Sequence, residues 1–476
     1  MCNLNDAGNP APHYSLMNIF RFLLASLNIE AILEEPTIHR RREQLSKMTG
    51  GLGLGDAYCT TIERIKAQGG GKLRLGIAAL MWVSHAERHL TADELYYALA
   101  VELCSKDLNT GNIPSISTVL SCCRGLISLD KEASVVRLIH FTLKEYLSTQ
   151  NHIFRRSHAI MAEICLTYLN SKQIKAFSHP SPSSRDTTFL EYCSLYWGVH
   201  AKKELSGQAK SLALELFQEN GGPGHLPTQF LVDRALDLDK RYFGDYFPFD
   251  GLHCASFFGI VEVVAALTEM GHSDHDGGDF WGYTPLSWAA FNGHDEVVKL
   301  LLGQEVIDPD KPGNGSRTPL TYAALEGHEG VVRILLQRDD VNPDKPDNHG
   351  TTPLSLAAEL GHDNVVKILL SREEVDPENL DNDGDTPLSC AALGGCEGVV
   401  RILLEQEGIN PDRPNHTGQT PLSIAARKGH KEVIKILLGR EEVNPNMVDN
   451  DGQTPLQHAA KHGHHQVVEL LQHHER

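Results

Sequence analysis

The chain has 476 residues, which is too long for one hydrophobic core and predicts two to four domains. Its 41% hydrophobic and 22% charged residues are the proportions of soluble globular proteins. The formal net charge is −19, and the stretch from Asp279 onward holds 17 lysines and arginines against 32 aspartates and glutamates. This acidity excludes a general binder of nucleic acid or of an anionic membrane, because phosphate groups require a basic face.

Ten cysteines in a chain of this length are too sparse for a disulfide framework, and none shows the spacing of a zinc site. Residues 1–12 lack the charged-then-apolar pattern of a secretory signal. The longest apolar-rich run, Leu73 to Val83, is too short to span a membrane and contains Arg74. We therefore expect a protein of the cytoplasm, the nucleus or both, not secreted and without membrane contact.

Residues 1–70 are predicted to form a helical segment. Apolar residues recur at helical spacing over 14–33, 38–48 and 57–68, and glycines interrupt the pattern at 50–56. A phosphate-binding loop would need Gly-Lys-Ser or Gly-Lys-Thr, whereas Gly71-Lys72 is followed by Leu73. No nucleotide cofactor is therefore expected.

Residues 71–150 predict a winged helix. Helical stretches cover 73–84, 95–104 and 115–124, and Thr91 with Glu94 forms the capping box of the second. Alternating residues at 126–130 and 135–141 predict a strand hairpin after the three helices. The third helix offers only Arg124 to DNA, which favours packing within the protein over direct nucleic-acid binding.

Residues 151–244 predict a helical linker domain. Apolar faces recur around Leu166, Tyr192 and Leu212, and two breaks lie at 178–185 and 221–224.

The rest of the chain, residues 245–476, is repetitive. Thr-Pro-Leu recurs every 34 residues, beginning at Thr284, Thr318, Thr352, Thr386, Thr420 and Thr454. In each copy Thr can cap a helix, Pro suits its first position, Ala-Ala permits close packing, and a glycine can end it. A Val-Val or Val-Ile and Leu-Leu stripe then predicts a second helix. One copy cannot bury its apolar face alone, so the copies must stack.

This pattern resembles the ankyrin repeat, whose signature is T-P-L-H-x-A. Ser, Thr or Gln replaces the signature histidine in all six copies, and the loop after the second helix is one residue longer, as in Val341-Asn342-Pro343-Asp344. A weaker seventh copy without Thr-Pro begins at Gly251. The sequence thus predicts a mainly α fold, an ankyrin-repeat solenoid preceded by a helical and winged-helix region.

Residues 14–150 show a second resemblance, carried by Phe20-Arg-Phe-Leu-Leu-Ala25, by Tyr58 with Ile62-Glu-Arg-Ile65, and by the segment Leu138-Ile-His-Phe-Thr-Leu-Lys-Glu-Tyr-Leu147. The segment is similar to the part behind the nucleotide-binding domain of fungal STAND proteins, in which a winged helix links a NACHT-type NTPase to repeats. The NTPase core of that family is not found in this sequence, so the resemblance does not imply ATP-driven switching.

The remaining motifs indicate no catalytic or metal site. His85 and His89 lack a glutamate directly after the first histidine, as a metalloprotease requires, and Asp381–Asp385 lacks the glutamate that completes a calcium loop. The histidines near the end of the chain predict a solvated helix end. We therefore expect no enzymatic activity and no cofactor.

Solenoids bind partners on the concave surface that stacking creates. In an ankyrin array this surface consists of the turn before Thr-Pro and the positions after Ala-Ala, and there the copies differ. Large aromatic residues favour binding but also dominate cores, so both interpretations stay open for the first repeat. The candidate partner-binding residues are Phe280, Trp281, Tyr283, Trp288 and Phe291, followed by Arg317, Glu326, His349, Glu359, Asp383, Gln419, Arg427, Lys428, Lys461 and His462.

Three functions fit these observations. The first is a non-catalytic scaffold or adaptor that binds a protein partner on the concave surface. The second is a nuclear transcription co-regulator that docks a transcription factor, for which His39-Arg40-Arg41-Arg42 is the one basic run of note. The third is the sensor part of a STAND-type signalling protein.

Overall fold

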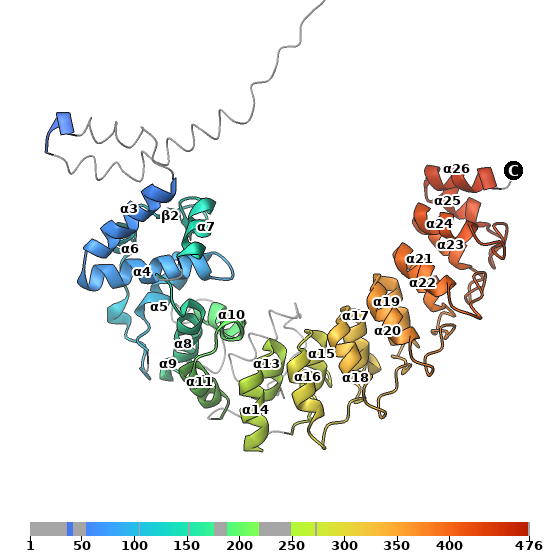
Figure 1. The fold of residues 1–476 in the computed structure, drawn as a ribbon, viewed down its shortest axis with the longest axis horizontal. Coiled ribbons are helices and arrows are strands. Elements are labelled where there is room, and N and C mark those ends of the chain that lie inside the picture. Colours follow the sequence, from blue (N-terminus) through green and yellow to red (C-terminus); the bar gives the residue numbers. More distant parts are fainter. Residues whose placement is uncertain are drawn as a thin grey trace, which may run out of the picture. The chain divides into compact units, whose positions relative to one another are not determined.

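A computed structural model describes residues 36–40, 54–103, 105–150, 153–175, 188–218, 249–271 and 274–474. The chain divides into two compact units, the first holding the described residues up to Leu216 and the second those from Phe217. Figure 1 shows that helices dominate both units. The mainly α fold, with a repeat solenoid after a winged helix, is confirmed. The helix expected at 14–33, most of the one at 38–48, and the breaks at 178–185 and 221–224 lie outside the described residues.

The winged helix is built as the sequence predicted, with one strand added. Its sheet has the order β1-β3-β2 and is antiparallel, with Leu90 opposite Val136 and Ile127 opposite Leu138. The two-residue strand β1 was not predicted, because it is too short to show an alternating pattern. The elements are α3 (Leu54–Ala67), α4 (Gly70–His85), β1 (Leu90–Thr91), α5 (Ala92–Ala100), η1 (Thr110–Asn112), α6 (Ile116–Cys122), β2 (Ile127–Asp130), β3 (Val135–Leu138) and α7 (Phe141–Thr149).

The predicted capping box is present. The Thr91 side chain accepts the N–H of Glu94, and the Glu94 carboxylate accepts the N–H of Thr91. The helix that it opens ends at Ala100 rather than at residue 104. Residues 101–103 are partly or fully exposed, so a further helical turn would bury no apolar face.

The winged helix packs on the helices that follow it in the first unit. The fully buried indole of Trp82 in α4 meets Phe189 and Tyr192 edge-on, with ring centroids 5.6 and 5.8 Å apart. The division of the chain at residues 70, 150 and 244 stays a prediction. The following helices are α8 (Ser157–Leu169), α9 (Lys172–Lys175), α10 (Leu190–Lys203) and α11 (Gly207–Gln218).

Each repeat of the second unit is a pair of antiparallel helices, and Figure 1 shows the pairs following one another along an arc from α13 to α26. The first helices of successive repeats contact each other, as do the second helices, so the array has two layers. The pairs are α13 (Gly251–Phe258) with α14 (Val261–Met270), α15 (Pro285–Phe291) with α16 (Asp295–Leu302), α17 (Pro319–Leu325) with α18 (Glu329–Leu335), α19 (Pro353–Leu360) with α20 (Asp363–Leu370), α21 (Pro387–Gly394) with α22 (Glu397–Leu404), α23 (Pro421–Lys428) with α24 (Lys431–Leu438), and α25 (Pro455–Lys461) with α26 (His465–His474).

The Thr-Pro motif acts as the sequence predicted. Threonine is the N-cap in all six full copies, and its hydroxyl accepts the N–H of the third helical residue, as Thr352 does from Ser355 at 3.2 Å. Ser355 fills the position of the signature histidine, and its hydroxyl lies 3.2 Å from that of Thr352. The seventh copy is in register but is capped differently, because Asp250 accepts the N–H groups of Leu252 and His253.

A glycine and a histidine join successive repeats. Gly327 adopts φ +74°, and a Cβ there would lie 2.6 Å from Nδ1 of His362 in the next repeat. The Nε2–H of His362 donates 2.9 Å to the carbonyl of Leu325, which is left unpaired at the end of α17. The same bond is made by His294, His328, His430 and His464, at 2.9–3.1 Å.

Cys396 replaces the histidine at one junction and donates weakly, its Sγ lying 3.2 Å from the carbonyl oxygen of Glu359. We predict that Cys396→His stabilises the array by about 1 kcal/mol, the net value of one hydrogen bond. His362→Cys should destabilise it by a similar amount. Urea unfolding of the full chain measures both changes, and an unchanged midpoint in both variants would contradict this account of the junctions.

The first unit contains a buried histidine network, in which His85, His158 and His200 have lowered pKa values because burial disfavours the charged ring. The pKa of His200 falls to about 3, whereas an unfolded histidine titrates near 6.5. The unfolded chain thus binds more protons between these values, so stability is lost as the pH falls below about 6.5. Hydrogen exchange in α8 and α10 should rise over this range. His200→Asn should flatten the pH dependence, and the exposed His89→Asn should leave it unchanged.

Candidate protein-binding surface of the repeats

In five of the six full copies, the turn before Thr-Pro is held by a side chain five residues before the threonine, whereas Gly313 fills this position before Thr318. Oδ1 of Asp347 accepts the N–H groups of His349 and Thr351, at 2.8 and 3.1 Å. The equivalent oxygens of Asp279, Asp381, Asn415 and Asp449 each accept the N–H groups of the residues two and four positions later. The Asp381 segment is therefore a turn, as the sequence indicated.

The tips of these turns also bond to one another along the array. The N–H of Asn382 donates 2.8 Å to the carbonyl of His349, and the N–H of His416 donates 2.9 Å to that of Asp383. The amide side chain of Asn382 adds a bond to the carbonyl of Asn348 at 3.0 Å. The backbone of the tips is fixed in this way, so exposed side chains on it have defined positions.

The aromatic residues of the first full repeat fall into two groups. Trp288 is only 1% exposed, and its Nε1–H donates 3.0 Å to Oδ2 of Asp279. Rings surrounding Trp288 with centroids 4.8–6.2 Å away belong to Phe249, Phe257, Tyr283 and Phe291. Trp288 thus belongs to the core shared with the weak repeat, and its large apolar area is already used there.

The other members of the aromatic group lie nearer the surface. Phe280 at the turn tip is 54% exposed and meets the partly exposed Trp281 edge-on, with centroids 5.5 Å apart. Tyr283 is partly exposed, and its ring lies 4.9 Å from that of Tyr322 in the next repeat. Of the five aromatic candidates, Phe280 offers a partner the most accessible ring.

The candidates of the middle repeats differ in accessibility. Arg317 lies at the base of a turn, where its Nε donates 3.1 Å to Oδ2 of the buried Asp347. Glu326, His349 and Asp383 are exposed, while Glu359 is half-buried at the end of α19. Arg317 is consequently tied into the frame, and the four others present polar groups at turn tips and helix ends.

The candidates of the last two repeats are mostly cationic. Lys428, Lys461 and His462 are exposed. Arg427 and Gln419 are half-buried, the second through a turn in which its N–H donates 3.0 Å to Asn415. The helix ends thus change from acidic, at Glu326 and Glu359, to basic, at Arg427, Lys428 and Lys461.

Leu360 is a further exposed residue on this surface that the sequence analysis missed. It is the last residue of α19 and is 50% exposed. The equivalent positions of the other full repeats hold Asn292, Glu326, Gly394, Lys428 and His462. A comparison of the repeats at this one offset would have found it, because it is the one large apolar residue in the set.

Two other kinds of site, a membrane span and a metal site, differ in how far the described residues support them. No helix in the described part of the chain is long and apolar enough to cross a membrane. The first unit brings Glu87, His158 and His200 close enough together to hold a metal ion. The spacing of His85 and His89 predicts no metal site, and that pattern does not include His158 or His200.

Family models match both parts of the chain. Ankyrin repeats match in three copies, at residues 252–347, 339–415 and 407–476, and the winged-helix domain of GPI inositol-deacylase matches residues 62–160. No curated protein matches the chain significantly. Among solved structures, the human ASB11 ankyrin repeat domain is similar with 26% identity and a TM-score of 0.42, over 46% of this chain and 96% of that one. The chain therefore contains ankyrin repeats and, before them, a winged-helix domain of the GPI-inositol-deacylase type.

Proposed function

We propose that this protein is a non-catalytic scaffold that binds a protein partner on its ankyrin repeats. The observation that carries the proposal is an exposed leucine, Leu360, between acidic and basic helix ends. Ankyrin repeats generally mediate protein–protein binding, and the junction contacts to the carbonyls of Leu325 and Glu359 hold the backbone of these helix ends.

The exposed side chains around Leu360 indicate which residues a partner would carry. Leu360 offers an apolar contact of the kind that anchors interfaces when a partner covers it. Glu326 and Glu359 lie one repeat before and beside it, and Arg427 and Lys428 lie two repeats after it. A partner segment with an apolar side chain, basic residues toward the first repeats and acidic residues toward the last would complement this surface.

Two finer functions are alternatives to a general scaffold. The order of a winged helix followed by repeats supports the sensor part of a STAND-type signalling protein. A nuclear co-regulator is supported by the basic run that begins at His39. Imaging of the tagged protein separates a nuclear co-regulator from a STAND-type sensor, because strict exclusion from nuclei contradicts a co-regulator. ATP turnover by the purified chain would contradict a non-catalytic role.

We predict that Leu360→Lys lowers the amount of partner recovered at least tenfold, because the lysine replaces an apolar contact with a charge that must be buried. Capture from an extract of the producing cells, followed by quantitative mass spectrometry, measures the loss. Val306→Lys is the matched control, because Val306 is also an exposed aliphatic residue, 67% accessible, but lies in the loop after α16.

A partner that is lost with Leu360→Lys and kept with Val306→Lys supports the proposed surface. Equal recovery of every protein with both variants contradicts it. Trp288→Ala is unsuitable for this test, because removing a buried tryptophan costs about 3–5 kcal/mol of stability and would weaken binding indirectly.

A further inference from the structure

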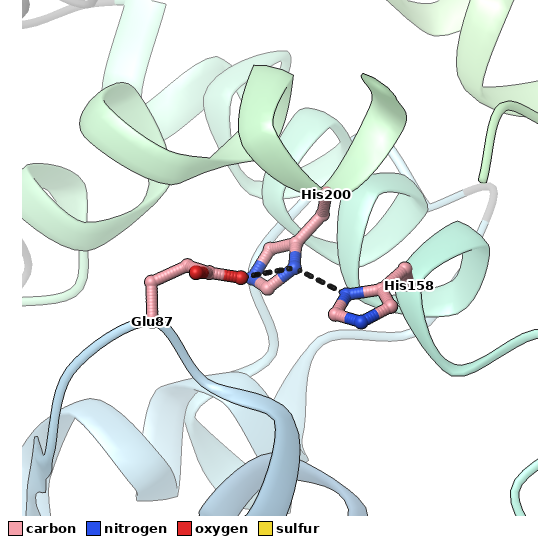
Figure 2. A group of neighbouring side chains, drawn as sticks. All are labelled: Glu87, His158 and His200. Carbon is pink, nitrogen blue, oxygen red and sulfur yellow. Dashed lines mark hydrogen bonds and ion pairs between the residues drawn. The ribbon is translucent and has the colours of Figure 1, made fainter. Parts of the chain in front are cut away.

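Three potential metal ligands converge in the first unit from segments far apart in the sequence. Glu87 lies in the turn between α4 and β1, His158 in the first turn of α8, and His200 near the end of α10 (Figure 2). Nδ1 of His158 is 2.9 Å from Nδ1 of His200, and Oε1 of Glu87 is 3.7 Å from the latter. One atom from each residue lies within 4.8 Å of the other two.

These separations suit a small cation. Zinc bound to nitrogen and oxygen at about 2.0–2.1 Å in a tetrahedron keeps its ligands about 3.3 Å apart. The observed 2.9 and 3.7 Å lie on either side of that value. The three ligand atoms lie within 4.8 Å of one another, so a turn of the Glu87 side chain toward His158 would bring its carboxylate to a cation held by the two imidazoles.

The protonation of the two histidines also suits a metal. Two Nδ1 atoms that face each other hold either one shared proton or a cation between their lone pairs. The Nδ1 atoms of His158 and His200 are 2.9 Å apart, so only one of them can carry a hydrogen toward the other. A cation therefore needs to displace at most one proton from the pair.

The other nitrogen of His200 has a partner that fixes the ring. Nε2 lies 2.9 Å from Oη of Tyr192, and the same oxygen accepts the N–H of Glu87 at 3.2 Å. Such outer contacts orient the ligating imidazole and typically contribute a factor of about 10–100 in metal affinity.

One cation already faces the site. Nζ of Lys203 lies 2.6 Å from Oε1 of Glu87. The side chain of Lys203 is 45% exposed, so it can turn to solvent when a metal takes the carboxylate. The charges of Glu87 and Glu204 both act on His158, and His85 stands beside it with ring centroids 5.6 Å apart. Lys203 thus competes with a metal ion for the Glu87 carboxylate, while the charges of Glu87 and Glu204 attract the metal ion.

We propose that Glu87, His158 and His200 form a binding site for a divalent cation of the zinc class. Two imidazole nitrogens and one carboxylate oxygen favour zinc over magnesium or calcium, which prefer oxygen ligands alone. Water completes the coordination on the open side. Because the ligands come from three segments, the cation links the turn after α4 to α8 and α10 and stabilises the first unit.

The test uses the full chain carrying His473→Gln and His474→Gln, which removes exposed histidines that could bind metal at the end of α26. Cobalt(II) is added to metal-free protein, and the visible absorption of four-coordinate cobalt is titrated, then competed with zinc. We expect one equivalent of cobalt, displaced by zinc, and a rise in the melting temperature with zinc. His158→Gln and Glu87→Gln should each weaken binding at least about tenfold.

Further variants separate a metal site from a hydrogen-bond network. Tyr192→Phe should weaken binding about tenfold or more, and Lys203→Met should tighten it several-fold, because the competing ammonium is gone. The exposed His89→Gln is the control and should bind as the parent does. Unfolding in the presence of a chelator verifies that each variant folds. The proposal is wrong if the parent binds no cobalt, or if folded His158→Gln and Glu87→Gln bind it as well as the parent.

Discussion

The repeats depend on one interaction, the packing of a histidine from one repeat beneath a glycine of the repeat before it. The glycine adopts a positive φ to end its helix and has no Cβ, which leaves room for the ring. The ring then donates to a carbonyl that the helix end leaves unpaired, as His362 does to Leu325. A repeat cannot bury its apolar stripe alone, so each junction stabilises both neighbours. The junction at Cys396 lacks the ring and has a thiol, a weak donor, in its place.

The capping, turn and junction contacts explain why positions that recur from copy to copy say little about function. Capping and turn contacts use the polar groups of Thr352, Ser355 and Asp347. Trp288, although a large aromatic residue, is buried in the core. The binding surface that we propose consists of positions that differ between copies and reach solvent. Phe280 and Leu360 are such positions, and charged helix ends surround the second.

The first unit follows a different principle. Its winged helix shares a core with α8 and α10 through Trp82, Phe189 and Tyr192. At the edge of that core, polar groups replace apolar packing and satisfy one another, as in the contacts among Tyr192, His200 and His158. Buried networks of this kind are costly unless every member is paired. Their concentration where three segments meet is the reason that a cation fits there.

The sequence by itself determined the repeat period, the helix pairs, the caps and the winged-helix order, because these depend on local residue spacing that every copy or turn displays. The prediction that partners bind at the turn tips and helix ends also came from the sequence, and it stays a prediction. Only the tertiary structure decided which of those side chains reach solvent, since burial depends on neighbours from other repeats: Trp288 lies inside, whereas Leu360 lies outside. The grouping of Glu87, His158 and His200 was likewise invisible in the sequence, because residues 71 and 42 positions apart carry no common spacing until the helices pack.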